Sequence, residues 1–202
     1  MKIKKGTIII NLHLSEHELF NKLHRRIKKS IRKAKRNNII VEISKSCDEA
    51  YDLYVTSCKY LYLKPKDKKI VFFKGFKLFV AKINNKIISM YTVKFDENSS
   101  KEIYNATDPQ YRDTQANSLL KWYIILYSKK IGLDYYDLGG FDPFNKDPKI
   151  KRINEYKLNW GGEKKLYYLD LGIGEYLFFY VRHFKIVQFF KNFYDKLKIS
   201  KI

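Results

Sequence analysis

Residues Tyr135–Gly162 read YYDLGGFDPFNKDPKIKRINEYKLNWGG, and this stretch decides the fold. An aromatic segment ends in Gly139 and Gly140, a charged loop follows, and Lys157 stands three residues before Trp-Gly-Gly. Glycine lets a backbone turn sharply or approach a neighbouring group closely, because it carries no side chain. We therefore expect a short buried strand, a helix and a further strand, with a close backbone contact at the double glycine.

The segments on either side alternate between helical and strand periodicity. Ser15 and Glu18 form a capping-box pattern at the start of a basic amphipathic helix. The predicted helices cover residues 15–36, 48–60, 114–130 and, rich in aromatic side chains, 175–198, and the predicted strands cover 7–12, 39–43, 76–83, 86–95, 102–106, 135–138 and 165–169. An antiparallel meander followed by one late crossover predicts an α/β fold with a mixed, mainly antiparallel sheet flanked by helices.

The chain is strongly basic. Its 202 residues suffice for one domain, and 41 Lys and Arg against 21 Asp and Glu give a net charge of +20 spread along the sequence. Such a charge attracts nucleic acid, an anionic membrane face or a phosphorylated substrate, and does not choose between them. A general lysine bias of the source proteome is the plain alternative. The aromatic helix over 175–198 is typical either of a core element or of a helix resting in lipid headgroups.

Neither metal binding nor export is indicated. Cys47 and Cys58 do not form a metal-ligand spacing, and the four histidines are scattered, so we expect no metal and a reduced, cytoplasmic protein. The sequence contains no apolar run long enough to span a bilayer and no export pattern at the N-terminus, which leaves contact with the inner membrane face as the expected relation to a membrane.

Six motifs occur in the order found in one known family. They are Arg26-x-x-x-Ser30-Ile31-Arg32-Lys33-Ala34, Asn84-Asn85-Lys86-Ile87-Ile88-Ser89, Tyr104-Asn105-Ala106-Thr107, Leu119-Leu120-Lys121-Trp122, Asp137-Leu138-Gly139-Gly140 and Tyr156-Lys157-x-x-Trp160-Gly161-Gly162. With these motifs the chain resembles the Fem-type (FemABX) aminoacyl-tRNA-dependent transferases of peptidoglycan bridges, in their C-terminal domain. The resemblance implies one GNAT-like domain over residues 1–202, of the acyl-coenzyme-A N-acyltransferase type.

The resemblance also implies an activity, which is transfer of an amino acid from aminoacyl-tRNA to an amino group of a cell-wall precursor, lipid-linked in some members. This reaction needs alignment, removal of a proton and a positive group beside the developing oxyanion. Lys157 matches the family lysine for the last role, and Asp108 and Asp137 are the candidate bases. The expected substrate-binding residues are Tyr104, Gly139, Gly140, Tyr156, Trp160 and Arg112, with Lys121 as a further phosphate contact.

The second half of the basic helix suits a tRNA backbone. The expected phosphate contacts are Arg25, Arg26, Arg32, Lys33 and Arg36. A solvated basic face is the simpler interpretation of the same residues. Three further structural interpretations remain open from the residues alone. Lys157 would be one of many surface lysines, the double glycine would form a plain turn, and Asp137 would brace the loop.

The chain departs from the family in length. Two-domain members are about twice as long, so acceptor-nucleotide binding does not carry over, and a homodimer, a partner subunit or a smaller acceptor would replace the first domain. No cofactor is implied beyond the tRNA-borne donor. A coenzyme-A-dependent N-acyltransferase is the first alternative, with acetyl-coenzyme A as donor, but Tyr111–Asn117 contains no glycine to cradle a pyrophosphate. A non-catalytic RNA- or membrane-binding protein is the second.

Overall fold

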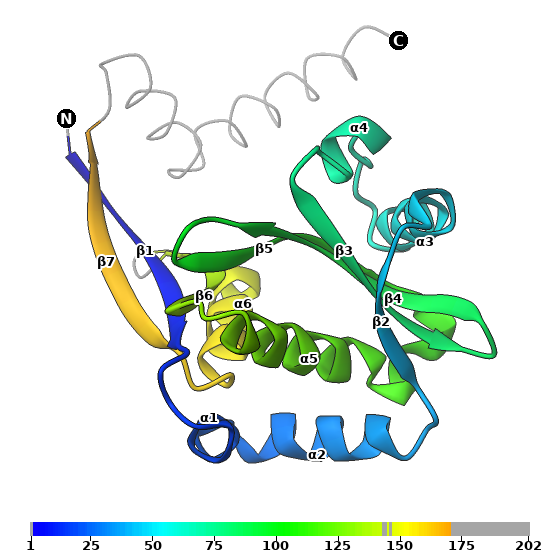
Figure 1. The fold of residues 1–202 in the computed structure, drawn as a ribbon. Helices are drawn as coiled ribbons and strands as arrows, with labels where there is room; N and C mark the ends of the chain where they lie inside the picture. Colours follow the sequence, from blue (N-terminus) through cyan, green and yellow to red (C-terminus); the bar gives the residue numbers. More distant parts are fainter. Residues whose placement is uncertain (1, 143–144, 146, 171–202) are drawn as a thin grey trace, which may run out of the picture.

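A computed structural model describes residues 2–142, 145 and 147–170 of the chain (Figure 1). The helix predicted over 175–198 lies outside these described residues. The elements follow in the order β1 (Lys2–Asn11), α1 (Glu16–Lys22), α2 (Arg25–Lys35), β2 (Ile40–Ser44), α3 (Cys47–Tyr60), α4 (Lys68–Val71), β3 (Phe76–Ile83), β4 (Lys86–Phe95), β5 (Ser99–Thr107), the 3-10 helix η1 (Pro109–Thr114), α5 (Ala116–Lys130), β6 (Tyr135–Phe141), α6 (Pro148–Leu158) and β7 (Glu163–Asp170).

A seven-stranded mixed sheet organises the described residues, in the order β2-β3-β4-β5-β6-β1-β7. β5 and β6 run parallel and are joined by the α5 crossover, whereas the other neighbouring strands pair antiparallel. Figure 1 shows α5 and then α2 on one side of the sheet, with α3 and α4 on the other. The predicted α/β class, the meander and the late crossover are confirmed.

Each face of the sheet has its own hydrophobic core. On one face, Leu120 and Ile124 of α5 and Ile27 of α2 pack with Ile88 and Tyr91 of β4. On the other face, buried residues of α3 pack against side chains of β3 and β4, namely Ala50, Leu53, Tyr54, Leu78, Val80 and Met90. The central strands are therefore buried on both sides, which explains their nearly continuous apolar sequences.

The single basic helix predicted over 15–36 is wrong, because the chain forms two helices. Leu23 closes α1 in an extended conformation, and His24 caps α2 by accepting a hydrogen bond from the Arg26 backbone N–H. The His24 backbone N–H donates to the Asn159 carbonyl over 2.9 Å, and this tertiary contact fixes the break. The capping box at Ser15 and Glu18 is confirmed. The other predicted elements differ mainly at their ends, as β1, β5 and β6 are longer, and the short helices α4 and η1 were not predicted.

Trp-Gly-Gly at the end of α6 is a packing motif. Trp160 is 1% exposed, and Gly161 has a φ of +75°. A Cβ on Gly161 would lie 2.8 Å from the Lys22 backbone oxygen, and one on Gly162 would lie 2.6 Å from Ile8 Cγ2. These two glycines therefore let the end of α6 press against α1 and β1.

We predict that Gly161→Ala lowers the free energy of unfolding by about 1–3 kcal/mol, because it combines an unfavourable φ with a backbone clash. Urea unfolding followed by circular dichroism measures this change. Gly140→Ala is the matched control, since a Cβ there meets nothing within 4 Å and its φ is not positive. Equal stability of the two variants would contradict the packing role of Gly161.

Candidate functional site

The two parallel strands part soon after they pair. β5 and β6 are in register only from Ser99 to Lys101 and from Tyr135 to Asp137. Beyond this point β6 continues beside β1, and β5 continues beside β4. Among the strands that the structure describes, none pairs with this edge of β5 from Glu102 to Thr107. β5 and β6 are therefore splayed apart beyond Lys101 and Asp137.

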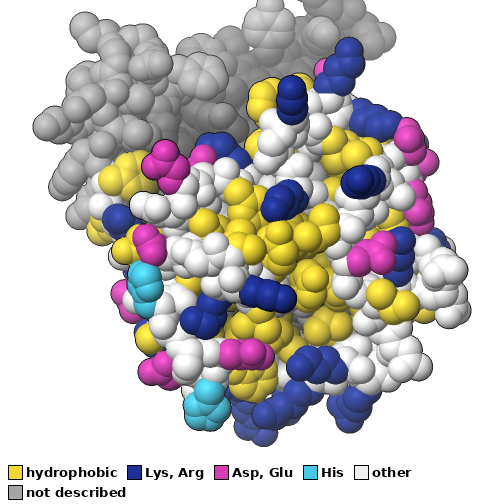
Figure 2. Space-filling view, viewed as in Figure 1, with side chains coloured by type: hydrophobic (Ala, Val, Ile, Leu, Met, Phe, Trp, Pro, Cys, Tyr) yellow, Lys and Arg dark blue, Asp and Glu magenta, His cyan; other side chains and the backbone are white. Residues whose placement is uncertain are grey.

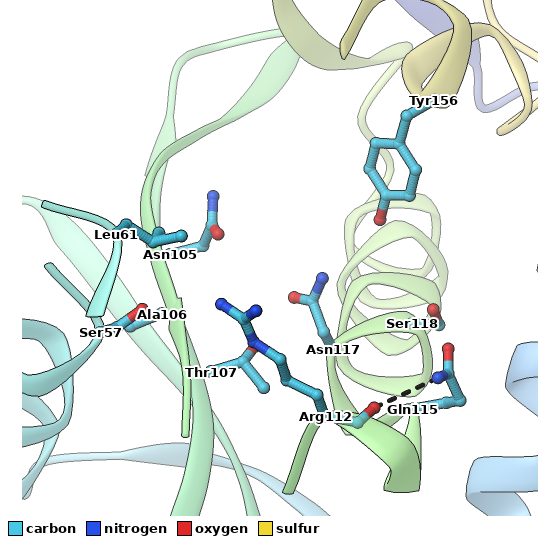
Figure 3. Close-up of a pocket in the computed structure, with 10 residues that line it drawn as sticks. All are labelled: Ser57, Leu61, Asn105, Ala106, Thr107, Arg112, Gln115, Asn117, Ser118 and Tyr156. Atoms are coloured by element: carbon cyan, nitrogen blue, oxygen red, sulfur yellow. Dashed lines mark hydrogen bonds between the residues drawn. The ribbon is translucent and has the colours of Figure 1, made fainter. Parts of the chain in front are cut away.

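A pocket of about 320 Å³ opens along this free edge. Figure 3 shows that Asn105 of β5, Asn117 at the start of α5 and Tyr156 of α6 surround it, with Arg112 reaching into the same space. The Tyr156 hydroxyl points toward the pocket (Figure 3). The α5 N-terminus, which carries a partial positive charge, faces the pocket as well. The pocket therefore presents amide, hydroxyl and cationic groups to a ligand.

A buried ion pair fills the base of the gap between β5 and β6. Lys121 is only 2% exposed, and its Nζ lies 3.1 Å and 3.0 Å from the two Glu102 carboxylate oxygens. The Tyr136 hydroxyl donates to Glu102 over 3.3 Å. Burial lowers the pKa of Lys121, but the Glu102 charge, the neighbouring Tyr156 hydroxyl and the hydrogen bond to Glu102 together outweigh it and leave that pKa above its usual value. The prediction that Lys121 contacts phosphate is wrong, because its ammonium is enclosed and already neutralised.

Aromatic rings enclose the Lys121 ammonium. Its Nζ lies 5.5 Å from the ring centre of Tyr91, 5.2 Å from that of Tyr156 and 5.3 Å from that of Trp160. A cation over aromatic faces is attracted by their electron-rich surfaces. Lys121 therefore holds the α6 aromatic side chains over the gap. The predicted site residues Tyr156 and Trp160 are brought together here, with their rings 6.3 Å apart.

Lys157 lies at the opposite lip of the gap. Its Nζ donates to the Gly140 carbonyl over 2.8 Å, which brings together two predicted site residues. Burial lowers the pKa of Lys157, and nearby Lys121 and Lys101 lower it further, whereas Glu102 and Asp137 raise it; the net direction is downward. Lys157 is thus a partly desolvated cation with a single backbone partner among the described residues. Such a group can turn toward a substrate oxygen at little cost.

Asp137 is engaged on both carboxylate oxygens. One oxygen accepts from the Gly139 backbone N–H over 2.7 Å and from the Thr7 hydroxyl, and the other lies 3.0 Å from Lys101 Nζ. Gly139 itself has a φ of +81°. These bonds brace the turn within β6 that presents the Gly140 carbonyl to Lys157. A role for Asp137 in bracing the loop, which the sequence left open, accounts for all of these contacts.

Asp108 lies at the far end of β5 from the ion pair. It caps η1 through the Gln110 backbone N–H and pairs with Lys86 Nζ at 2.9 Å. Burial would raise the pKa of Asp108, but these two hydrogen bonds outweigh it and hold the pKa below its usual value. A carboxylate with a lowered pKa is a weak proton acceptor at neutral pH. The base role of Asp108 stays an untested prediction.

The remaining predicted substrate contacts divide between two places. Arg112 lines the pocket and stacks on Tyr60, with its guanidinium carbon 4.3 Å from the ring centre. Tyr104 instead packs edge-on against Tyr54 of α3, at 5.9 Å between ring centres. Tyr104 therefore belongs to the packing under α3, next to the pocket residue Asn105.

The basic residues predicted to meet tRNA lie on α2 and just after it. Arg25, Arg26, Arg32, Lys33 and Arg36 are all exposed. Figure 2 shows Lys and Arg side chains gathered along the lower edge of the molecule, where Figure 1 places α2. Asn37, just beyond α2, donates to the Thr114 carbonyl over 3.2 Å. The C-terminal end of the basic helix therefore adjoins the η1–α5 turn that borders the pocket.

Sequence reasoning missed Glu102, Asn117 and Tyr91. A lysine within the otherwise apolar run from Leu119 to Leu126 was a signal of a buried partner, and Glu102 is the only acidic residue of β5. Asn117 Oδ1 and Trp160 Nε1 are buried and lack a hydrogen-bond partner in the part of the chain that the structure describes. Asn117 also lines the pocket, so its side chain borders the space that a ligand would occupy.

Neither a metal centre nor a membrane span is found within the described residues. No cluster of three or more His, Cys, Asp or Glu side chains in residues 2–142, 145 and 147–170 has the arrangement of a metal site. Over the same residues, no helix has both the length and the apolar character needed to cross a bilayer.

Solved structures share this architecture, although no protein-family model matches the sequence. FemX superposes with a TM-score of 0.71 at 15% identity, over 86% of this chain and 63% of the FemX chain. The C-terminal DUF2156 domain of a putative lysylphosphatidylglycerol synthetase from Agrobacterium fabrum superposes with a TM-score of 0.69 at 12% identity. The match covers 83% of this chain and 60% of that one. L-PGS from Bacillus licheniformis superposes with a TM-score of 0.63 at 10% identity, over 90% of this chain and 66% of the L-PGS chain.

The present chain thus spans about three-fifths of the length of each of these structures. Identities of 10–15% establish a shared fold. The shared fold agrees with the motifs that suggested a Fem-type resemblance. It also agrees with the splayed β5 and β6 strands. The chain has the α/β fold seen in FemX and in the C-terminal DUF2156 domain of a putative lysylphosphatidylglycerol synthetase.

Proposed function

We propose that this protein is an aminoacyltransferase that moves an amino acid from aminoacyl-tRNA to an amino group of a cell-wall precursor. The observation that carries the proposal is a partly desolvated lysine, Lys157, which lies beside the gap between the splayed strands and bonds to the Gly140 carbonyl of β6. Its sequence neighbour Tyr156 lines the polar pocket. The fold shared with FemX supports the same class of reaction.

The reaction forms one bond and breaks another. The acceptor nitrogen bonds to the ester carbonyl carbon, the carbon–oxygen bond to the tRNA ribose breaks, and the amine proton passes to the departing ribose oxygen. Negative charge develops on the carbonyl oxygen in between, where a positioned ammonium lowers the barrier. Lys157 supplies that ammonium after exchanging the Gly140 carbonyl for the substrate oxygen. The Asn117 side chain, which lines the pocket, borders the bound donor amino acid or the acceptor.

A lipid headgroup is the second candidate acceptor. Two of the similar structures are a domain of a putative lysylphosphatidylglycerol synthetase and L-PGS. The name of the first protein includes a phospholipid, phosphatidylglycerol, as the group that is modified. In this version the attacking group is a lipid hydroxyl, and the product is an ester. The chemistry at the carbonyl oxygen is unchanged, so Lys157 has the same role.

The first experiment incubates the full chain with a pool of labelled aminoacyl-tRNAs and either cell-wall precursor extract or phosphatidylglycerol vesicles. Mass spectrometry then identifies the acceptor that gains an amino acid. RNase treatment before the incubation abolishes the reaction if the donor is tRNA-borne. A parallel reaction with acetyl-coenzyme A tests the coenzyme-A alternative. Product from acetyl-coenzyme A alone would overturn the aminoacyl-tRNA proposal.

We predict that Lys157→Met lowers kcat about 10²–10³-fold, the loss seen when one oxyanion donor is removed. Single-turnover kinetics with bound substrates measure this loss. Because burial disfavours the charge on Lys157, its removal should not lower the stability of the fold, and thermal unfolding provides the control. An unchanged kcat would rule out the electrophilic role.

The pH profile gives a separate prediction. A lysine acts here in its protonated form, so transfer falls as pH rises through its pKa, and that pKa lies below the ordinary 10.5. Lys157→Arg retains its charge throughout this range and should keep part of the activity without this alkaline decline. An identical decline in Lys157→Arg would assign the titration to another group.

We further predict that Arg32→Gln with Arg36→Gln raises KM for aminoacyl-tRNA and leaves kcat within about twofold. Each lost phosphate contact also reduces the dependence of log affinity on log salt by about one unit. Lys45→Gln with Lys130→Gln is the matched control, since both lysines are exposed and neither belongs to α2. Equal effects of the two pairs would indicate attraction by net charge alone.

A further inference from the structure

Exposed aromatic, aliphatic and basic side chains gather between α3 and β3. We call this surface the α3–β3 patch. It comprises Tyr60, Leu61, Tyr62, Leu63, Ile70 and Phe73, together with the exposed lysines Lys59, Lys64, Lys66, Lys69 and Lys74. Tyr62 is 98% exposed and Phe73 is 60% exposed. In Figure 2, the upper right of the described surface, where Figure 1 places α4, carries both hydrophobic and Lys or Arg side chains.

The conformation of Tyr62 is unfavourable for its residue type. Helix α3 ends with the Tyr62 backbone N–H donating to Lys59 and the Leu63 N–H donating to Cys58. This is a Schellman motif, in which the residue at the position of Tyr62 adopts a left-handed conformation and is usually glycine. Tyr62 has a φ of +54°. A bulky ring in a glycine position, in contact with almost nothing in the fold, indicates a role for that ring outside the described chain.

The patch adjoins the pocket that opens along the free edge of β5. Leu61 lines the pocket, and the Tyr60 ring stacks on Arg112, which also lines it. Lys66 is anchored to α3 through its backbone, since its carbonyl accepts from Tyr51 and its N–H donates to the Tyr54 hydroxyl. The loop that carries the exposed rings is therefore tied to the helix beside the pocket.

We propose that the α3–β3 patch docks on an anionic lipid surface and so places the pocket opening at the headgroup layer. Six lysines against one aspartate between residues 59 and 76 give the charge that anionic lipids attract. Exposed tyrosine and phenylalanine rings suit the headgroup region, and Leu61, Leu63 and Ile70 suit the outer part of the acyl chains. RNA would use lysines and rings but has no site for three exposed aliphatic side chains, so the lipid surface is the better match.

Co-sedimentation of the full chain with vesicles tests the proposal. We expect binding to phosphatidylcholine vesicles that contain about 30 mol% phosphatidylglycerol. Partitioning onto vesicles of pure phosphatidylcholine should be at least tenfold weaker. Added salt should weaken the binding, because it screens the lysines. Phe73→Ser combined with Leu63→Ser should reduce partitioning at least tenfold. Ile43→Ser is the matched control, because Ile43 is 44% exposed and lies on β2, outside the α3–β3 patch.

Tyr62→Gly separates docking from folding. Glycine relieves the left-handed strain, so this variant should unfold at the same or a higher temperature while partitioning severalfold less onto the anionic vesicles. Equal vesicle binding by Tyr62→Gly, by the Phe73 and Leu63 double variant and by the wild type would overturn the proposal. Loss of tRNA binding in these variants, with no binding of the wild type to vesicles, would overturn it in favour of an RNA surface. Vesicle binding needs no transfer, so either result leaves the proposed reaction to its own test.

Discussion

The early separation of β5 and β6 dictates what must fill the centre of the sheet. Three paired residues on each strand hold the sheet together, and the gap beyond them must be filled by something other than backbone hydrogen bonds. Lys121 and Glu102 fill it with a buried ion pair that the Tyr136 hydroxyl and three aromatic rings complete. The α6 segment packs over this pair, and it is α6 that carries Lys157. A charge pair inside the sheet therefore determines where the candidate reactive lysine lies.

The two glycine pairs of the sequence have different physical roles. Gly161 and Gly162 allow a close backbone approach to Lys22 and Ile8, so they serve packing between α6, α1 and β1. Gly139 and Gly140 instead shape one lip of the gap, where Asp137 fixes the turn and the Gly140 carbonyl receives Lys157. The first pair thus positions the helix, and the second pair positions its lysine. Together they explain why motifs about twenty residues apart in the sequence act on one site.

Local sequence patterns predicted most of the fold, because hydrophobic periodicity marks the helices and strands and the late crossover limits their topology. They failed where a distant partner decides the local structure. The break at Leu23 and His24 depends on a bond to Asn159, which no helical pattern in residues 15–36 reveals. Lys121 resembles a phosphate-binding cation until its neighbour Glu102, nineteen residues away, is placed against it. Lys157 was found from a motif, but its desolvation depends on the folded strands.

The buried ion pair also limits how this sequence can evolve. Loss of Glu102 alone leaves an unpaired ammonium in a closed space, and loss of Lys121 alone leaves an unpaired carboxylate, each at a cost of several kcal/mol. Two well-packed apolar residues would suit the same space, yet a chain that changes one position at a time must pass through a strongly destabilised intermediate. Lys121 and Glu102 are therefore an epistatic pair, expected to persist or to disappear together in related sequences.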